Sequence, residues 1–458
     1  MDLSPLRLSY DGGTIIVNGG TPQQRAELPG VCFDTRTRCD RAEGRHYRAI
    51  LEELVRRKWP YDDQARGYEK IPWQLRDSRT PFPHQQEALD TWWGERGRGL
   101  VVLPTGTGKT FVAILAIERA GRPAMVVTPT IDLLNQWYGE LVAAFGEPIG
   151  LVGGGHYDIQ PITVTTYDSA FIHLERWGNK FGLVVFDECH HLPGPSYSMI
   201  AVGAIAPYRL GLTATPERAD GQEAVYPSLI GPIVYRREIK ELSGDFLAEY
   251  RTQRVFVTLS REEQESYQAA RDKYRRFIVE RNIPMSGPNG WQRFIFEASR
   301  SQEGWEAFQA YREQKRLERA AGAKLQKLEE LLRQHQGDRI LVFTADNATV
   351  YQIARRFLVP AITHQTKTRE RKLVLERFHN GEYPIVVTSQ VLNEGVDVPS
   401  ANVGIVLSGT STIRENVQRL GRLLRKQGAK QAILYEVVAS RTAEEFSSER
   451  RRQHHAFR

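Results

Sequence analysis

Two long stretches of the chain alternate short apolar runs with amphipathic segments of helical length. The first series of apolar runs covers residues 100–103, 124–128, 163–165, 183–186 and 209–212. The second series covers residues 339–343, 361–363, 385–388, 403–407 and 433–438. Short apolar strands that alternate with helices are typical of βα units in a parallel sheet. The pattern therefore predicts an α/β protein with two parallel-sheet domains.

The N-terminal region and the region between the two series have other patterns. Residues 6–10 and 14–17 are β-rich and flank an Asp-Gly turn signal, and helical spacing follows over 47–57, so a small α+β module is expected. Between the series, charged helical sequence replaces the βα rhythm and predicts a helical insertion. The expected helices of this region cover 262–281, 291–298, 305–320 and 324–335. The four expected domains cover 1–75, 76–245, 246–321 and 322–458.

The first apolar run leads into a glycine-punctuated loop that closes on Lys-Thr. Gly106 and Gly108 let backbone N–H groups turn inward, and the following helix adds its positive end, so the loop can bind an anion. Lys109 can then reach the β- and γ-phosphates of a nucleotide, and the Thr110 hydroxyl can ligate Mg²⁺. The first glycine of the usual phosphate-loop pattern is replaced by Leu103. The expected nucleotide-binding residues of the loop are Thr105, Gly106, Thr107, Gly108, Lys109 and Thr110.

Two carboxylates follow the fourth apolar run. Asp187 and Glu188 stand at the carboxyl end of a predicted buried strand, where Asp187 can hold Mg²⁺ and Glu188 can polarise the attacking water. Upstream of the loop, the amide of Gln85 has the donor and acceptor needed to pair with adenine, although a solvated helical glutamine would look the same. The hydroxyls of Thr213 and Thr215 can couple the carboxylate pair to neighbouring groups.

The second predicted sheet contains no phosphate loop but has its own polar motifs. Arg422 and Arg425 lie three residues apart, so on a helix their guanidinium groups face the same way and suit a γ-phosphate whose charge grows during transfer. The further candidates in this half are Gly395, Asp397 and Gln418.

Composition narrows the class of protein. The net charge of +7 favours a polyanionic partner, but a solvated basic surface would give the same value. Three cysteines are too few and too scattered for a disulfide framework or a four-ligand zinc site, so reduced thiols and no structural metal are expected. Since no apolar run is long enough for a membrane span and no secretory signal is present, a cytoplasmic protein without a membrane partner is expected.

Basic and aromatic residues are interleaved in the predicted insertion. Such a pattern can bind nucleic acid through backbone charge and base stacking, and it can equally supply the core of a helical hairpin. The aromatic residues concerned are Tyr267, Tyr274, Phe277, Trp291 and Trp305.

Taken in order, these motifs resemble those of superfamily 2 helicases. The matching segments are 83–86, 103–110, 128–130, 165–168, 187–190, 213–215, 342–346, 395–397 and 418–425. Within that superfamily the chain is most similar to compact XPB-type DNA helicases of archaea and bacteria. The Gly-Leu-Thr-Ala-Thr run at 211–215, the run at 389–399 and the N-terminal segments 10–15 and 33–36 carry this likeness.

The resemblance implies two RecA-like domains, a damage-recognition-like N-terminal domain and a thumb-like insertion. It implies ATP and Mg²⁺ as cofactors, DNA contacts at Thr130, Thr165 and Thr388, and a relay of nucleotide state through His190 and the 213–215 segment. The Arg-Glu-Asp motif of the family is represented by Arg218, Ala219 and Asp220, so its central carboxylate is missing. His84 stands where the family has an aromatic residue such as tyrosine.

Together these features predict an ATP-driven motor that opens or moves along duplex or forked DNA, in nucleotide excision repair or transcription-linked repair. Hydrolysis is expected to need groups from both RecA-like domains, the arginine pair included. Two alternatives remain open. One is a motor subunit that acts with a separate nuclease in restriction or repair. The other is an ATP-gated clamp that deforms DNA without processive unwinding. In either case a nuclease or a repair or transcription protein is a possible partner.

Overall fold

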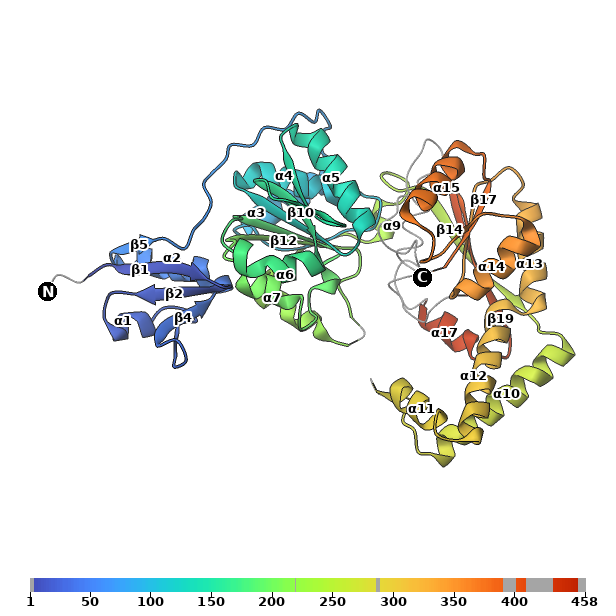
Figure 1. Cartoon of the computed structure of the whole chain (residues 1–458). Coiled ribbons are helices and arrows are strands. Elements are labelled where there is room, and N and C mark those ends of the chain that lie inside the picture. The colour runs from blue at the N-terminus through green and yellow to red at the C-terminus, as the bar shows by residue number, and fades with distance from the viewer. Residues whose placement is uncertain (1–3, 219, 286–288, 390–400, 409–430, 452–458) are drawn as a thin grey trace. The chain divides into compact units, whose positions relative to one another are not determined.

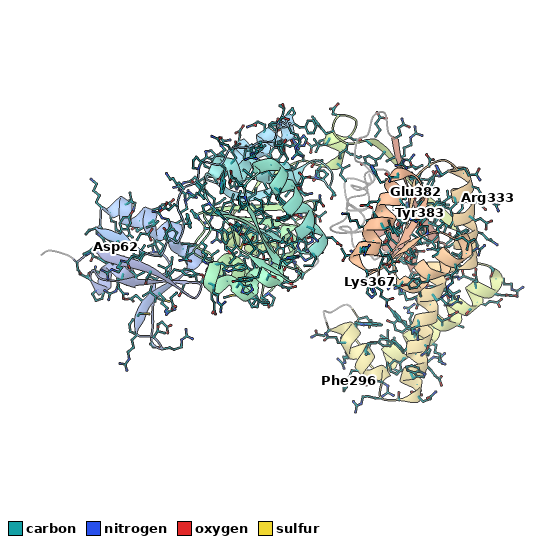
Figure 2. All side chains as sticks on the ribbon, turned by 45° about the horizontal axis from the view of Figure 1, so that its top comes forward. Asp62, Phe296, Arg333, Lys367, Glu382 and Tyr383 are labelled. Atoms are coloured by element: carbon teal, nitrogen blue, oxygen red, sulfur yellow. The ribbon has the colours of Figure 1, made fainter. Side chains whose placement is uncertain are left out.

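The computed structural model describes residues 4–218, 220–285, 289–389, 401–408 and 431–451. These residues fall into two compact units, Met1–Glu241 and Leu242–Arg458 (Figure 1). The first unit holds two sheets and the second holds one sheet with a helical insertion. Figure 2 shows the side chains of both units. Across the described part of the chain, no helix combines the length and apolarity needed to cross a bilayer.

The N-terminal module is the predicted α+β unit. Its five-stranded sheet has the order β3-β4-β2-β1-β5, and α2 packs Tyr47, Ile50 and Leu54 onto the buried positions of the β1–β2 hairpin. The hairpin turns at Gly12 and Gly13 and pairs Leu8 with Val17. The elements are β1 (Leu6–Asp11), β2 (Thr14–Asn18), α1 (Pro22–Ala26), β3 (Cys32–Asp34), β4 (Cys39–Glu43), η1 (Gly44–His46), α2 (Tyr47–Arg57) and β5 (Tyr61–Asp63).

The first RecA-like domain is an eight-stranded sheet of order β13-β6-β12-β11-β7-β10-β8-β9. All neighbours are parallel except β8 and β9, and helices cover both faces, with α3 to α5 on one and α6 and α7 on the other (Figure 1). Its strands are β6 (Arg98–Val102), β7 (Ala124–Thr128), β8 (Ile149–Gly153), β9 (His156–Asp158), β10 (Ile162–Thr166), β11 (Leu183–Asp187), β12 (Tyr208–Thr213) and β13 (Ile233–Arg236). Its main helices are α3 (Pro83–Gly94), α4 (Lys109–Ala120), α5 (Ile131–Phe145), α6 (Tyr167–Trp177) and α7 (Ser198–Gly203).

The N-terminal module packs on this domain through close backbone contacts and through side-chain hydrogen bonds to backbone carbonyls. A Cβ on Gly44 would lie 2.3 Å from the Gly203 carbonyl oxygen, and one on Gly178 would lie 1.9 Å from the Tyr10 hydroxyl. Tyr10 Oη donates to the carbonyl oxygens of Leu174 and Gly203, at 3.1 and 3.3 Å. The contacts lie at the segments that lead into β11 and β12, which is the amino edge of the sheet. Gly44 has no room for a side chain because the Gly203 backbone is too close, and Gly178 has none because the Tyr10 hydroxyl occupies the space.

Gly44→Ala is expected to loosen this joint. The added methyl group overpacks the contact with Gly203, which costs about 1–3 kcal/mol, so the first unit should melt at a lower temperature and release the module faster in limited proteolysis. Gly139→Ala is the matched control, because Gly139 lies within α5 and a Cβ there meets open space. That control should unfold at the same or a higher temperature. Equal melting of Gly44→Ala and wild type would contradict a close-packed joint.

The second RecA-like domain has a six-stranded parallel sheet of order β14-β19-β18-β15-β17-β16. Its strands are β14 (Glu249–Val257), β15 (Ile340–Phe343), β16 (Ala361–Ile362), β17 (Ile385–Thr388), β18 (Val403–Val406) and β19 (Gln431–Ala439). Its helices include α13 (Gly322–Gln334), α14 (Asn347–Phe357), α15 (Thr368–Asn380) and α17 (Glu444–Arg451).

Strand β14 changes the predicted domain boundary. It pairs in parallel with β19 along its whole length, from Glu249 opposite Gln431 to Val257 opposite Ala439. The second domain therefore starts before the helical insertion, and the insertion comprises α10 (Arg261–Glu280), α11 (Gly290–Ala298) and α12 (Gln302–Ala320). The sequence places the start of the insertion at residue 246, which is too early because β14 still belongs to the sheet. The strand at 249–257 is not recognised in the sequence because it carries polar side chains along an exposed edge and lacks a continuous apolar run.

Buried polar contacts fasten both ends of the insertion to its own domain. Tyr267 of α10 is fully buried, donates its hydroxyl hydrogen to Glu318 of α12 at 3.2 Å, and accepts from the Ala443 backbone at 2.8 Å. At the start of α13, the fully buried Lys324 donates to the Leu407 carbonyl at 2.7 Å and pairs with Glu444 at 2.6 Å. Such partly or fully buried bonds are strong constraints because breaking them leaves desolvated polar groups.

The aromatic residues of the insertion divide between core and surface. Phe277 is buried in a small core of the insertion and Tyr274 packs against it, while Tyr267 is buried in the core of the second domain. For these three rings the core interpretation is confirmed. Trp291 and Trp305 remain 43% and 53% exposed. Phe296 of α11 is also exposed (Figure 2). These outer rings remain available for stacking.

Candidate nucleotide site and its connections

The glycine loop joins β6 to α4 at the carboxyl edge of the first RecA-like sheet. Gly106 and Gly108 have φ values of +90° and +83°, which glycine adopts without strain. A Cβ on Gly108 would lie 2.2 Å from Gln85 Nε2, so the loop has no room for a side chain there. Helix α4 begins directly at Lys109, which aims the positive end of the helix at the loop. This is the strand, loop and helix arrangement of a phosphate-binding site.

The Gln85 side chain is hydrogen-bonded to the backbone of the glycine loop. Its Nε2 donates to the Thr107 carbonyl at 3.0 Å, and its Oε1 accepts from the Phe82 backbone at 2.9 Å. The ring Nε2 of His84 lies 3.0 Å from the same Thr107 carbonyl. Both side chains are almost fully buried. In this conformation Gln85 therefore fixes the loop, and its role toward adenine stays a prediction.

Polar groups inside the loop match a triphosphate. Lys109 Nζ folds back onto the carbonyl oxygens of Leu103 and Pro104, at 3.0 and 3.4 Å, and Thr107 Oγ1 donates to Pro104 at 2.8 Å. The Thr105 hydroxyl is buried without a hydrogen-bond partner among the described residues. A buried, unsatisfied hydroxyl in a glycine loop at the start of a helix fits a bound anion.

Asp187 and Glu188 stand at the same edge of the sheet, because β11 and β6 both flank β12 and run parallel. Glu188 has a left-handed backbone with φ of +45°, a conformation that costs a non-glycine residue about 1–3 kcal/mol. Its backbone N–H donates to Asp187 Oδ1 at 3.0 Å. The left-handed turn therefore begins directly at the carboxylate pair, and a hydrogen bond to Asp187 spans it.

The donor set at this edge fits Mg²⁺. Thr110 supplies a hydroxyl and Asp187 a carboxylate, both hard oxygen ligands. The described residues contain no cluster of three acidic, histidine or cysteine side chains that could hold a metal alone. A Mg²⁺ ion here would therefore complete its coordination with phosphate oxygens and water, as this ion prefers.

Two aromatic side chains hold Asp187, and sequence reasoning gave neither of them a role. The indole N–H of Trp137 donates to Asp187 Oδ2 at 2.7 Å, and the Tyr167 hydroxyl donates to the Asp187 carbonyl at 3.0 Å. Burial raises the pKa of Tyr167 well above its usual value, so the phenol stays protonated as a donor. Trp137 lies outside the matched segments and Tyr167 lies within segment 165–168, but the contacts of both with Asp187 depend on the packing of α5 and α6 on the sheet.

The predicted coupling residues form one connected group beside Glu188. His190 Nδ1 lies 3.4 Å from Glu188 Oε2 and 3.3 Å from Thr213 Oγ1, and Thr213 Oγ1 bonds the backbone of Thr215 at 3.2 Å. Arg218 donates to the His190 carbonyl and pairs with Asp220 at 2.6 Å. That guanidinium lowers the pKa of Asp220 to about 2. The structure thus brings together residues that are 32 positions apart in the sequence, from 188 to 220.

The two RecA-like domains share a pattern of threonines at their strand ends. In the first, Thr128 Oγ1 lies 3.4 Å from the carbonyls of Thr130 and Thr165. In the second, Thr344 Oγ1 lies 3.0 and 3.4 Å from the carbonyls of Asp346 and Thr388. Of the three residues expected to contact DNA, Thr165 and Thr388 are fully buried, while Thr130 is half-buried as the N-cap of α5. Only Thr130 presents its side chain near the surface in this conformation.

Some predicted site residues lie outside the described part of the chain. They are Gly395, Asp397, Gln418, Arg422 and Arg425, together with Ala219 of the Arg-Glu-Asp-like motif. Their roles stay predictions from the sequence.

Comparisons with known proteins agree with this architecture. Residues 8–65 match the family model of the xeroderma pigmentosum group B helicase damage recognition domain, 78–218 match the type III restriction enzyme res subunit, and 323–427 match the helicase conserved C-terminal domain. Among solved structures, the Hef helicase domain of Pyrococcus furiosus covers 81% of this chain and is itself covered to 98%, with a TM-score of 0.55 and 20% identity. That likeness concerns the fold.

Sequence relatives are closer. The DNA 3'-5' translocase XPB2 of Sulfurisphaera tokodaii is 38% identical over 88% of this chain and 98% of its own length. The DNA 3'-5' helicase XPB of Mycobacterium tuberculosis is 31% identical over 88% of this chain and 69% of its own length. With the N-terminal module, the glycine loop and both helicase domains in place, the chain belongs to the XPB-type DNA helicase and translocase family.

Proposed function

We propose that this protein is a Mg²⁺-dependent ATPase that moves along or opens duplex DNA in the 3'-5' direction, with a role in DNA repair. The observation that carries the proposal is the joint placement of the glycine loop and the Asp187–Glu188 pair at one sheet edge, connected to the His190–Thr213 group. The direction and the repair role rest on the names of the relatives and of the N-terminal family model.

Within this proposal each group of the nucleotide site has one task. The loop amides and Lys109 bind the phosphates, and Thr110 with Asp187 would hold Mg²⁺, which neutralises phosphate charge when bound. Glu188 accepts the proton of the attacking water. We retain the prediction that Arg422 and Arg425 serve the γ-phosphate, supported by their spacing and by the family.

The DNA contacts are proposed to be mainly with phosphates. Helices α5 and α6 begin with the N-caps Thr130 and Thr166 at the carboxyl edge of the sheet, so their positive ends are suited to backbone phosphates. The net charge of +7 supports the same type of partner. Phosphate contacts confer little sequence preference and make binding sensitive to salt.

ATP hydrolysis measured with no nucleic acid, duplex DNA, forked DNA and RNA tests the function. Duplex and forked DNA should stimulate hydrolysis while RNA does not, and the DNA concentration for half-maximal stimulation should rise steeply with salt. Strand-displacement and triplex-displacement assays run side by side then separate unwinding, translocation and static deformation. Hydrolysis that no DNA stimulates, or that RNA stimulates more strongly, would contradict the proposal.

A further inference from the structure

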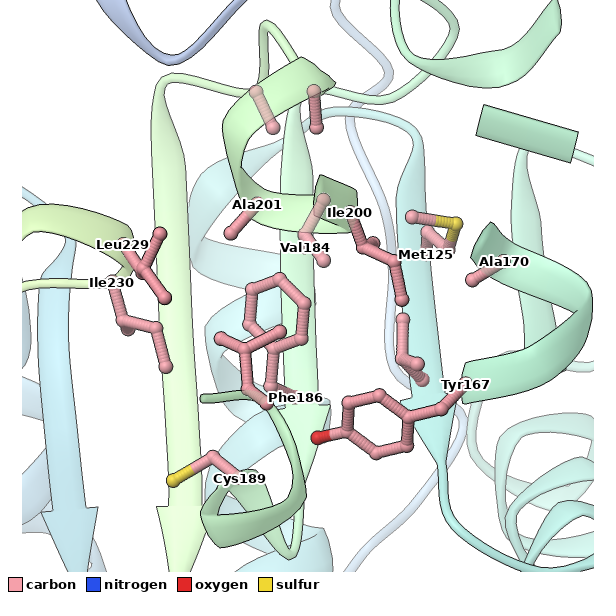
Figure 3. Close-up of a cluster of buried hydrophobic side chains, with 14 of the residues drawn as sticks. Met125, Tyr167, Ala170, Val184, Phe186, Cys189, Ile200, Ala201, Leu229 and Ile230 are labelled. Atoms are coloured by element: carbon pink, nitrogen blue, oxygen red, sulfur yellow. The ribbon is translucent and has the colours of Figure 1, made fainter. Parts of the chain in front are cut away.

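Asp187 accepts hydrogen bonds from side chains on both faces of the first RecA-like sheet. Trp137 reaches it from α5 on one face, and Tyr167 reaches it from α6 on the other. Figure 3 shows the Tyr167 ring extending from α6 toward Phe186 and Cys189, which precede and follow the carboxylate pair. The two contacts differ in kind, because Trp137 bonds the carboxylate and Tyr167 bonds the main chain.

The Trp137 contact restricts the carboxylate itself. The indole is 1% exposed and Asp187 is 6% exposed, so water cannot easily replace the 2.7 Å hydrogen bond. Oδ1 accepts from the Glu188 backbone while Oδ2 accepts from Trp137, and the two bonds together set the plane of the carboxylate. A buried hydrogen bond to an ionised oxygen is among the stronger contacts in a protein.

The helix that carries Trp137 starts at the residue expected to meet DNA. Thr130 caps α5, and Trp137 lies seven residues further along, about 10 Å at the rise of an α-helix. A helix transmits a displacement along its axis with little loss, so a shift at the Thr130 end moves the indole and, with it, Asp187 Oδ2. In α6 the contact is at the helix start itself, since Tyr167 follows directly after the N-cap Thr166.

We infer that Trp137 is a positioning residue, which orients the Asp187 carboxylate for Mg²⁺ and couples that orientation to DNA bound at the start of α5. The Mg²⁺ part depends on the nucleotide site alone, and the coupling part rests on the proposed DNA contact. Partners of metal-ligating carboxylates matter in general, since their removal weakens metal affinity or activity by about 10- to 100-fold.

The chain offers a matched control for the loss of an indole. Trp177 of α6 is as deeply buried as Trp137 in the same domain, yet its Nε1 has no hydrogen-bond partner within the described residues. Trp177→Phe therefore removes the same ring volume without removing a hydrogen bond. Trp92→Phe is a second control, because the Trp92 indole bonds the Arg209 carbonyl at 2.9 Å, away from the nucleotide site.

The test compares Trp137→Phe with both controls in the full chain. The first readout is binding of a fluorescent ATP analogue with Mg²⁺ and with EDTA, in the absence of DNA. In Trp137→Phe the affinity gained from Mg²⁺ should fall by about 10- to 100-fold, while the affinity in EDTA stays unchanged. The second readout is the ratio of ATP hydrolysis with and without duplex DNA, which should fall in Trp137→Phe although its DNA affinity is that of wild type.

A second variant replaces Trp137 by benzothienylalanine, in which sulfur takes the place of the indole N–H and the ring volume is kept. This variant provides the same test if Trp137→Phe does not fold. Both replacements should give the same loss. An unchanged Mg²⁺ gain in either folded variant, or an equal loss in Trp177→Phe, would overturn the positioning role. If wild type itself shows no DNA stimulation, the proposed function fails, while the Mg²⁺ measurement still decides the role of Trp137.

Discussion

Glu188→Gln is expected to lower kcat for ATP hydrolysis by about 10²- to 10⁴-fold, the range that a positioned general base contributes. The amide has the size of the carboxylate but cannot accept the proton of the attacking water. Asp187 accepts hydrogen bonds from the Glu188 backbone N–H and from the Trp137 indole, and the substitution changes neither donor, so these bonds stay in place. ATP affinity should therefore stay within a few-fold of wild type, which a steady-state assay and an equilibrium binding assay can check together.

Glu147→Gln is the control for this variant. Glu147 is exposed in the segment after α5 and lies outside the site, so its substitution should leave both parameters unchanged. A Glu188→Gln enzyme that retains kcat and loses only ATP affinity would show that Glu188 binds nucleotide rather than activating water. Loss of folding is checked by the melting temperature.

Lys109→Ala is expected to reduce ATP hydrolysis by about 10²- to 10³-fold, with and without DNA, since removal of one donor to a charged transition state has that effect. In the present structure Lys109 Nζ contacts the carbonyls of Leu103 and Pro104, so it must exchange these for phosphate oxygens when a nucleotide binds. Unlike Glu188→Gln, this variant should also bind ATP more weakly. Duplex DNA affinity should be retained.

Lys180→Ala serves as the matched variant. Lys180 is an exposed lysine in the segment that leads into β11, at the sheet edge opposite the glycine loop. Removal of its charge should leave ATP hydrolysis unchanged. Substantial turnover in Lys109→Ala would mean that the phosphates bind elsewhere.

The fold was largely predictable because its strands are buried on both faces and its helices are amphipathic. The apolar runs at 124–128 and 385–388 coincide with β7 and β17, and the periodic segment 47–57 coincides with α2. Prediction failed at β14, where the strand lies at the edge of the sheet and its side chains are polar. Edge strands have weak hydrophobic patterns because one side of the strand is not covered by another.

The site was predictable to the extent that its chemistry lies in contiguous motifs. The loop at 105–110 and the carboxylate pair at 187–188 have a local signature and meet at one edge of the sheet. Trp137 has no such signature, because its partner is 50 residues away and only the packed fold brings the two together. The same reason explains Thr165, which has the residue type of a phosphate contact but is buried by its neighbours.

The attachment of the insertion to the second domain makes it a useful position for a fluorescent label that reports domain motion. The insertion leaves the second domain after β14 and returns to it at α13. Because Tyr267 and Lys324 bond to that domain near both ends of the insertion, the insertion moves together with it. All three cysteines belong to the first unit, and Cys32 is the exposed one. A single engineered cysteine at an exposed position of α12, paired with a dye on Cys32, would therefore give a fluorescence ruler that follows the second domain through each catalytic cycle.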